Sequence, residues 1–127
     1  MKKIKRPAYL DAKGIRWDTN DADLEGVMSK KSKWIGEWRE RYFILKGSKM
    51  FFTKSSEEAP HGIIDLVDCL SVQGSTQHHK EHTLEIVMRN DERFVLCARS
   101  NDHKEAWITA VRRAIGIASS AHYDERG

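Results

Sequence analysis

Short apolar runs alternate with polar residues along most of the chain, and this period of two predicts a β-rich domain. We expect seven strands, at Leu24 to Lys30, Trp38 to Leu45, Lys49 to Lys54, Gly62 to Asp65, Leu70 to Val72, Thr83 to Val87 and Arg93 to Cys97. Turn residues such as Gly36, Gly47 and Pro60 separate them, as do polar stretches at 73–80 and 89–91. This close spacing is typical of an antiparallel sheet.

The pattern changes after Ser100, where apolar residues recur at the i, i+3, i+4, i+7 spacing of one helix face: Trp107, Ala110, Val111 and Ala114. Asn101 and Asp102 supply N-cap chemistry, and Asp102 with Glu105 has capping-box spacing. Trp107 lies on the apolar stripe, so we expect it to pack in the core and not to bind a ligand. The sequence predicts one C-terminal amphipathic helix that caps a curved sheet.

These elements divide the chain into an N-terminal extension (1–23), one folded domain (24–117) and a C-terminal tail (118–127). The first sixteen residues hold six basic side chains and a single acid, Asp11. We interpret this segment as a mobile tail, with an auxiliary membrane contact as the alternative.

Composition limits the possible functions. The 127 residues are 39% hydrophobic and fit one domain with one modest core, and the net charge of +3 favours anionic partners. The only cysteines, Cys69 and Cys97, lie in apolar runs, which predicts free buried thiols. We find no apolar run long enough to span a bilayer. We therefore expect a monomer in the cytoplasm.

The charge excess is concentrated in residues 30–41, KKSKWIGEWRER, which hold five basic side chains against two acids. The same window carries Trp34 and Trp38 and continues into an apolar, strand-like stretch. Cations and aromatic rings on an ordered edge suit a negatively charged surface with an apolar interior, such as a membrane.

Several blocks, in this order, resemble the pleckstrin homology (PH) domain family: Glu25-Gly26-Val27-Met28-Ser29-Lys30, Trp38-Arg39-Glu40-Arg41-Tyr42-Phe43-Ile44-Leu45, Gly62-Ile63-Ile64-Asp65-Leu66, and Trp107 in the C-terminal helix. The resemblance covers about residues 24–117. It implies a mainly β fold, a barrel-like or sandwich-like arrangement in which a bent seven-stranded antiparallel sheet forms two near-orthogonal halves and one helix closes an end.

The resemblance also implies a headgroup site. Phosphoinositide-binding members carry a Lys-x(n)-Arg/Lys-x-Arg motif, and Lys30, Arg39 and Arg41 stand at its positions. Arg39 and Arg41 alternate along a strand, so both should face one side. Arginine offers phosphate a planar fork of donors, and Lys30 adds a point charge. The alternative is a solvated strand face paired with acids such as Glu85.

The loop between the first two strands is the expected membrane contact, through Lys31, Lys33, Trp34 and Ile35. Its aromatic and aliphatic side chains can enter the acyl boundary while the ammonium groups meet anionic headgroups. Alternatively, Trp34 folds back onto the domain.

Two positions depart from the tight 3-phosphoinositide binders of the family. Phe51 stands where they have a tyrosine and lacks its hydroxyl, and His61 stands where they have an arginine and is mostly neutral at about pH 7. We therefore expect a less selective site, with phosphatidic acid as a competing ligand. Small apicomplexan acylated PH-domain proteins, which the chain could resemble, imply that ligand. Myristoylation requires a glycine directly after Met1, and this sequence has Lys2 at that position.

Other chemistry is weakly represented. His78, His79 and His82 lie in a polar loop without a scaffold of further ligands, so we expect a surface loop and no metal site. No nucleophile-base motif or glycine-rich nucleotide loop is present, so we expect neither an enzyme nor a cofactor. A protein-interaction module on the same scaffold is the main alternative to a lipid-binding module. Nucleic acid is an unlikely partner because the aromatic residues are not spread over a sheet face.

Overall fold

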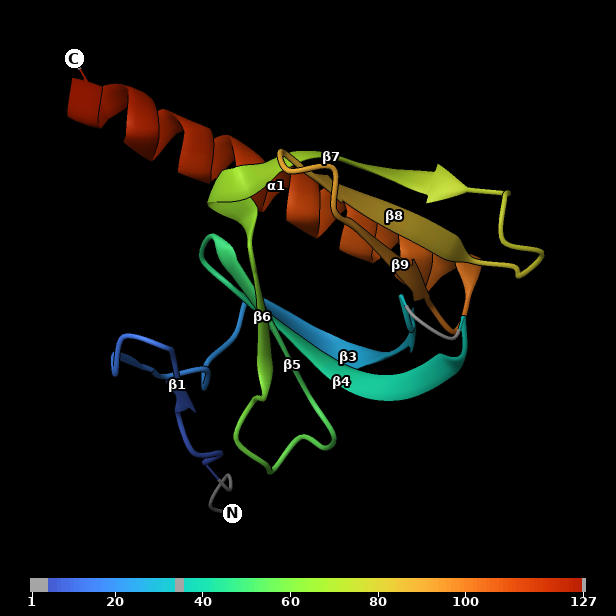
Figure 1. The fold of residues 1–127 in the computed structure, drawn as a ribbon, viewed down its shortest axis with the longest axis horizontal. Helices are drawn as coiled ribbons and strands as arrows, with labels where there is room; N and C mark the ends of the chain where they lie inside the picture. The colour runs from blue at the N-terminus through green and yellow to red at the C-terminus, as the bar shows by residue number, and fades with distance from the viewer. Residues whose placement is uncertain (1–4, 34–35, 127) are drawn as a thin grey trace.

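The computed structural model describes residues 5–33 and 36–126, which form an antiparallel sheet of seven strands with one long helix (Figure 1). The strands are β3 (Leu24–Lys31), β4 (Trp38–Lys46), β5 (Lys49–Thr53), β6 (Gly62–Asp65), β7 (Cys69–Ser75), β8 (Thr83–Met88) and β9 (Arg93–Cys97), and Leu66–Asp68 form a 3-10 turn. Their order across the sheet is β6-β5-β4-β3-β9-β8-β7. The predicted fold class is confirmed.

The sheet bends where β3 gains a second partner strand. Along its whole length β3 pairs with β4, but it pairs with β9 only through Ser29 and Lys30. Strands β3 to β6 and strands β7 to β9 therefore form two halves that share only this short join. The side chain of Lys30 starts from the join, which matters for the site described below.

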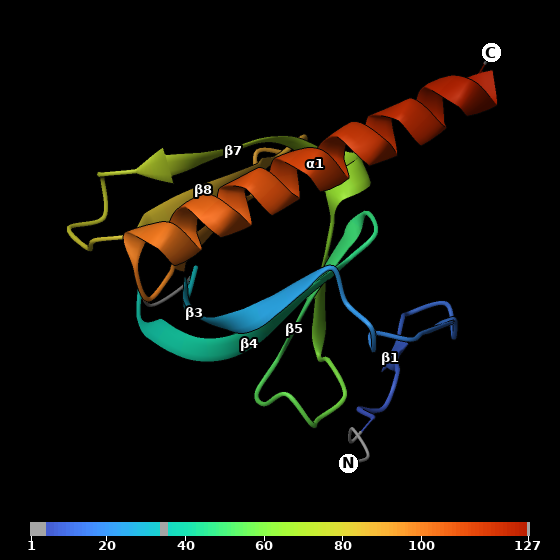
Figure 2. The same ribbon diagram turned by 180° about the vertical axis from the view of Figure 1, so that it is seen from behind.

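The helix α1 (Asn101–Arg126) lies across the bent sheet, as seen from behind in Figure 2. Its apolar stripe is buried, with Val111 fully enclosed and Trp107 4% exposed. The Trp107 ring meets the Phe43 ring edge-on at 6.5 Å between centroids. Core packing of Trp107 is thus confirmed. Within the described part of the chain, no helix combines the length and the apolar character needed to cross a membrane.

Both ends of α1 differ from the expectation. Ser100 is the N-cap, since its Oγ accepts a hydrogen bond from the backbone N–H of His103 at 3.1 Å. The predicted N-cap residues, Asn101 and Asp102, already belong to the helix. At the other end the helix continues to Arg126, through most of the segment expected as a C-terminal tail (118–127). Ala118 is buried and extends the apolar stripe by one further turn.

The N-terminal extension, interpreted from the sequence as a mobile tail, contains secondary structure. Strands β1 (Tyr9–Leu10) and β2 (Arg16–Trp17) form a small hairpin beside the sheet. The Tyr9 ring packs on Phe51 of β5, with 5.6 Å between centroids. The hairpin therefore covers an apolar part of the outer face of the sheet, a partner that local sequence does not reveal.

Arg6 fastens this extension. Its guanidinium donates to the backbone oxygen of Thr19 at 2.9 Å, to that of Ser56 at 3.0 Å and to the Glu25 carboxylate at 2.8 Å. Arg6 is only 6% exposed, so a cation that looks like part of a soluble tail is a buried link between the extension, β3 and the β5–β6 loop.

The two thiols agree with the sequence. Cys69 and Cys97 are both free and buried. Burial raises the pKa of the Cys69 thiol, which keeps it protonated at neutral pH.

Candidate functional site

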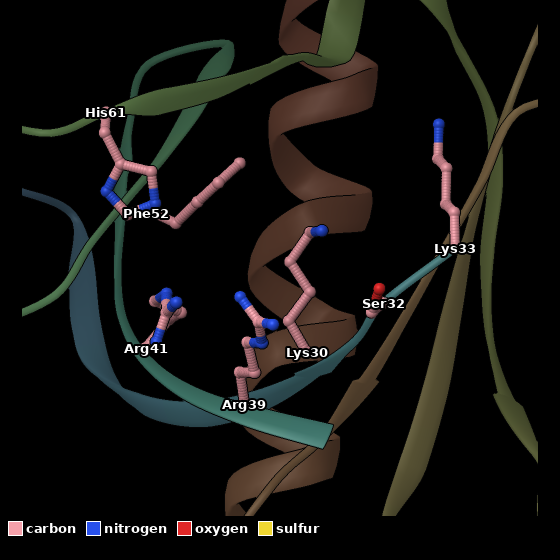
Figure 3. Close-up of a pocket in the computed structure, with 7 residues that line it drawn as sticks. All are labelled: Lys30, Ser32, Lys33, Arg39, Arg41, Phe52 and His61. Atoms are coloured by element: carbon pink, nitrogen blue, oxygen red, sulfur yellow. The ribbon is translucent and has the colours of Figure 1, made fainter. Parts of the chain in front are cut away.

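A basic cavity of about 260 Å³ lies between strands β3 and β4 and the start of β6. Its lining comprises Lys30, Ser32, Lys33, Arg39, Arg41, Phe52 and His61 (Figure 3). Figure 3 shows Lys30, Arg39 and Arg41 rising from neighbouring strands into one space, with Phe52 and His61 facing them. Four residues predicted for the headgroup site, Lys30, Arg39, Arg41 and His61, are thus brought together.

The register of β3 and β4 explains this convergence. Lys30 lies directly opposite Arg39, and Met28 lies opposite Arg41. Residues opposite each other in an antiparallel pair share a face of the sheet, so all four side chains project to the inside of the bend. Met28 is buried in the core. The inner face therefore changes from apolar to cationic where the interior opens to solvent.

Lys30 is the innermost of the cations. Its ammonium nitrogen lies 5.4 Å from the centroid of the Phe52 ring and 5.7 Å from that of Phe94, within range of a cation–π attraction to both. Burial lowers the pKa of Lys30, and the positive charges of Lys33 and Arg41 lower it further. The cations therefore repel one another in a partly desolvated space, which an anion would relieve.

The carboxylates near the cavity leave its centre unneutralised. Arg39 approaches Glu37 at 3.7 Å, in a pair whose side chains are both more than half exposed. Lys33 forms an ion pair with Glu92 of the β8–β9 turn. Among the described residues, Lys30 and Arg41 form no ion pair. An exposed pair contributes little, so the cavity keeps a positive potential.

Glu85 does not neutralise these cations, contrary to the solvated-face alternative. It is 5% exposed and is held elsewhere, by His78 at 2.5 Å and by Arg93 at 3.2 Å. Glu40 likewise points to the other face, where its carboxylate lies 3.8 Å from Arg99. The structure therefore separates Arg39 and Arg41 from the acid between them, as strand alternation predicts.

The floor of the cavity is an aromatic residue that sequence reasoning missed. Phe52 lines the cavity, whereas Phe51, the expected counterpart of the family tyrosine, lies on the opposite face against Tyr9. The Phe52 ring lies so close to Gly62 that a methyl group there would come within 2.0 Å of it. Adjacent Phe51 and Phe52 look alike locally, although a glycine opposite one of them hints at ring contact.

His61 forms the wall beside this floor. Its ring meets that of Phe52 edge-on, with 5.2 Å between centroids, and its backbone N–H donates to the Phe52 carbonyl at 3.0 Å. Burial lowers the pKa of His61, followed by the charge of Arg41 and those of Lys54 and Lys30. The imidazole is consequently neutral at pH 7 in the absence of ligand.

The expected membrane-contact residues are only partly described. Trp34 and Ile35 lie outside the described residues. Lys33 lines the cavity, but Lys31 points to the other face, where its Nζ lies 3.4 Å from the Nδ1 atom of His78. The half-buried Trp38 has two ammonium groups near its ring: that of Lys31 lies 6.0 Å and that of Lys80 lies 4.7 Å from the ring centroid.

The loop histidines are not gathered around a common centre. His78 bonds to Glu85, and His82 approaches Glu81 at 3.7 Å. In the part of the chain that the structure describes, no cluster of histidine, cysteine or acidic residues could hold a metal ion.

Comparison with known proteins places this geometry in a family. The sequence profile of the PH domain matches residues 22–116. Pleckstrin homology domain-containing protein 1 of Arabidopsis thaliana is 30% identical over 116 residues, which cover 86% of this chain and 79% of the plant protein. The human ceramide transfer protein is 31% identical over 88 residues, or 69% of this chain, but the match spans only 14% of that longer protein.

Solved structures agree on the fold. The C-terminal PH domain of pleckstrin, in complex with D-myo-Ins(1,2,3,5,6)P5, aligns with a TM-score of 0.67 at 24% identity, over 74% of this chain and 95% of that one. The PH domain of human oxysterol-binding protein-related protein 11 aligns with a TM-score of 0.66 at 17% identity, over 77% and 83% of the two chains. The bent sheet, the capping helix and the profile match together establish that this chain belongs to the pleckstrin homology domain family.

Proposed function

We propose that the chain binds anionic phospholipids, either phosphoinositides or phosphatidic acid, and so associates peripherally with cytosolic membrane surfaces. The headgroup phosphate is held by Lys30, Arg39, Arg41 and His61. The observation that carries the proposal is the convergence of three permanent or near-permanent cations in one cavity, two of them without an ion pair among the described residues.

The chemistry of the cavity favours phosphate. The guanidinium groups of Arg39 and Arg41 can each present parallel donors to two oxygens of one phosphate, and Lys30 adds a charge from the adjacent strand. Burial and the charges of Lys33 and Arg41 lower the pKa of Lys30, so a negative group placed beside it would favour its charged form. A phosphate group supplies the missing negative charge, and binding restores the Lys30 pKa toward its ordinary value.

The range of headgroups follows from what the cavity lacks. Phe52 offers a ring face and no hydroxyl donor, and His61 is neutral before ligand binds. A small phosphomonoester such as phosphatidic acid needs fewer donors than a polyphosphorylated inositol, so both remain within the proposed ligand class. The pleckstrin domain with the same fold was solved with an inositol pentakisphosphate, which supports an inositol-phosphate-sized ligand.

Membrane contact adds to headgroup binding. Each basic residue near an anionic leaflet contributes about 1 kcal/mol, so Lys31 and Lys33 alone form a weak anchor. We propose that Trp34 and Ile35 supply the apolar part by entering the acyl boundary, a role that rests on the sequence of the loop.

Co-sedimentation with vesicles tests the proposal. Vesicles should contain phosphatidic acid, each mono- or polyphosphoinositide, or phosphatidylserine, at physiological salt. Arg41→Ala should remove the preference among headgroups, and Trp34→Ala should weaken binding to all anionic vesicles alike. Arg113→Ala is the matched control, because this exposed arginine lies on α1 and does not line the cavity.

The proposal fails if the wild-type protein binds none of these vesicles, or if Arg41→Ala and Arg113→Ala behave alike. Absence of lipid binding would leave the protein-interaction module as the function to pursue.

A further inference from the structure

The ion pair between Lys33 and Glu92 closes one side of the basic cavity. Lys33 comes from the loop that follows β3, whereas Glu92 comes from the β8–β9 turn in the other half of the sheet. The pair is the one place where an acid from that half reaches a lysine lining the cavity, among the described residues. Both side chains are partly exposed, at 45% and 33%, so a ligand can displace the contact.

Hydrogen bonds fix the backbone that carries the acid. The β8–β9 turn is closed by backbone hydrogen bonds from Met88 to Glu92 at 2.8 Å and from Asp91 to Met88 at 3.0 Å. The Asn90 side chain also accepts from the Glu92 N–H at 3.0 Å. The Glu92 carboxylate therefore projects from a fixed backbone.

A second cavity, of about 400 Å³, lies behind this pair. Glu92 lines it together with Asp65, Asp68 and one cation, Arg89. Phe94 lies at the boundary between the two cavities. It lines the second cavity, and the ammonium groups of Lys30 and Lys33 lie 5.7 and 5.4 Å from the centroid of its ring. A headgroup that extends from the basic cavity past Lys33 thus approaches the Glu92 carboxylate.

Resting on the proposed function, we infer that Glu92 is a specificity-determining residue that discriminates against headgroups with additional phosphates. A single phosphomonoester reaches Lys30, Arg39 and Arg41 and leaves the Lys33–Glu92 pair intact. A second phosphate on the side of the β8–β9 turn must break this pair and approach the Glu92 carboxylate. Glu92 therefore shifts the preference of the site toward small phosphomonoester headgroups.

The test compares two lipids in otherwise neutral vesicles: phosphatidic acid, with one phosphate, and phosphatidylinositol bisphosphate, at equal molar fraction. Glu92→Gln should strengthen binding to the bisphosphate by about fivefold, the effect of one charge at such a surface, and binding to phosphatidic acid by less than about twofold. Glu81→Gln is the matched control, since Glu81 is 92% exposed in a neighbouring loop and lines neither cavity. It should change both affinities by the same factor.

The ratio of the two affinities is the decisive measurement, because a loss of folded protein would reduce both alike. A ratio that is unchanged in Glu92→Gln, while wild-type binding persists, overturns this inference and leaves the proposed function standing. A shift of the ratio in Glu81→Gln as large as in Glu92→Gln also overturns it. If neither the wild type nor Glu92→Gln binds either vesicle, the proposed function fails as well.

Discussion

Replacing Gly62 with alanine would place a methyl group inside the space of the Phe52 ring. The added Cβ would lie 2.0 Å from Cζ, 2.3 Å from Cε2 and 2.7 Å from Cε1 of that ring. Carbon atoms in van der Waals contact are about 3.5–4.0 Å apart, so the ring end must retreat by about 1.5–2 Å. The backbone does not oppose the change, because the φ of Gly62 lies outside the left-handed region.

The ring has one direction in which to move. Phe43 packs against Phe52 at 5.9 Å between centroids on the core side, so the displaced ring shifts into the basic cavity toward Lys30. Overpacking of this kind costs about 1–3 kcal/mol of folding stability. Displacing one cation from the phosphate costs roughly 1 kcal/mol more in binding, or about a fivefold loss of affinity.

Urea unfolding followed by tryptophan fluorescence measures the first effect, and vesicle co-sedimentation measures the second. Gly26→Ala is the matched control, because a Cβ at Gly26 meets no atom within 4 Å. The reasoning is refuted if Gly62→Ala keeps wild-type stability and wild-type binding. A stricter check repeats the substitution in a Phe52→Leu background, where the shorter side chain should remove most of the stability cost.

Three further substitutions probe the site and its support. Burial and Arg41 lower the pKa of His61 in the free protein, and a bound phosphate should raise it, so binding takes up a proton. The wild-type affinity for bisphosphate vesicles should therefore rise as the pH falls from about 7 to about 5.5. His61→Gln should abolish this rise. Arg6→Ala should lower the free energy of unfolding in urea by about 2–4 kcal/mol, because the buried Thr19 oxygens lose the donors that Arg6 supplies. Ser100→Ala should cost about 1 kcal/mol in the same assay through loss of the N-cap.

Each of these has a neighbouring control. His103→Gln, on an exposed part of α1, should leave the pH dependence unchanged, and equal slopes for both histidine variants would reject the role of His61. Lys5→Ala should be nearly neutral because Lys5 is exposed; a cost equal to that of Arg6→Ala would contradict the buried network. A larger loss for Asn101→Ala than for Ser100→Ala would place the N-cap one residue later.

The cations of the site were predictable because strand alternation acts over neighbouring residues. Arg39 and Arg41 are two positions apart, so any extended conformation directs them to the same side. Placing Lys30 beside them required the pairing of two strands, which the family resemblance supplied and the register of β3 with β4 explains. The lowered pKa of His61 depends on burial and on cations that are distant in the sequence, so the residues next to His61 could not predict it.

The N-terminal extension shows the limit of composition as a guide. A basic segment near the chain end normally remains in water, and Arg6 looks like part of one. Its partners Thr19, Glu25 and Ser56 lie 13, 19 and 50 residues further along the chain. Burial of this arginine is therefore a property of the assembled fold and not of its neighbours in sequence.

Sequence alone determined the kind of domain, because the alternation of apolar residues and the helical stripe that carries Trp107 fix which surfaces must be buried. Only the tertiary structure decided which of two adjacent phenylalanines forms the cavity floor and which acid forms an ion pair with a lysine of the cavity wall. A shift of one residue exchanges the faces of a strand, so the pairing of β5 with β4 and β6 places Phe52 inside and Phe51 outside. The contact of Glu92 with Lys33 likewise depends on the pairing of β3 with β9, which places the loop after β3 beside the turn before β9.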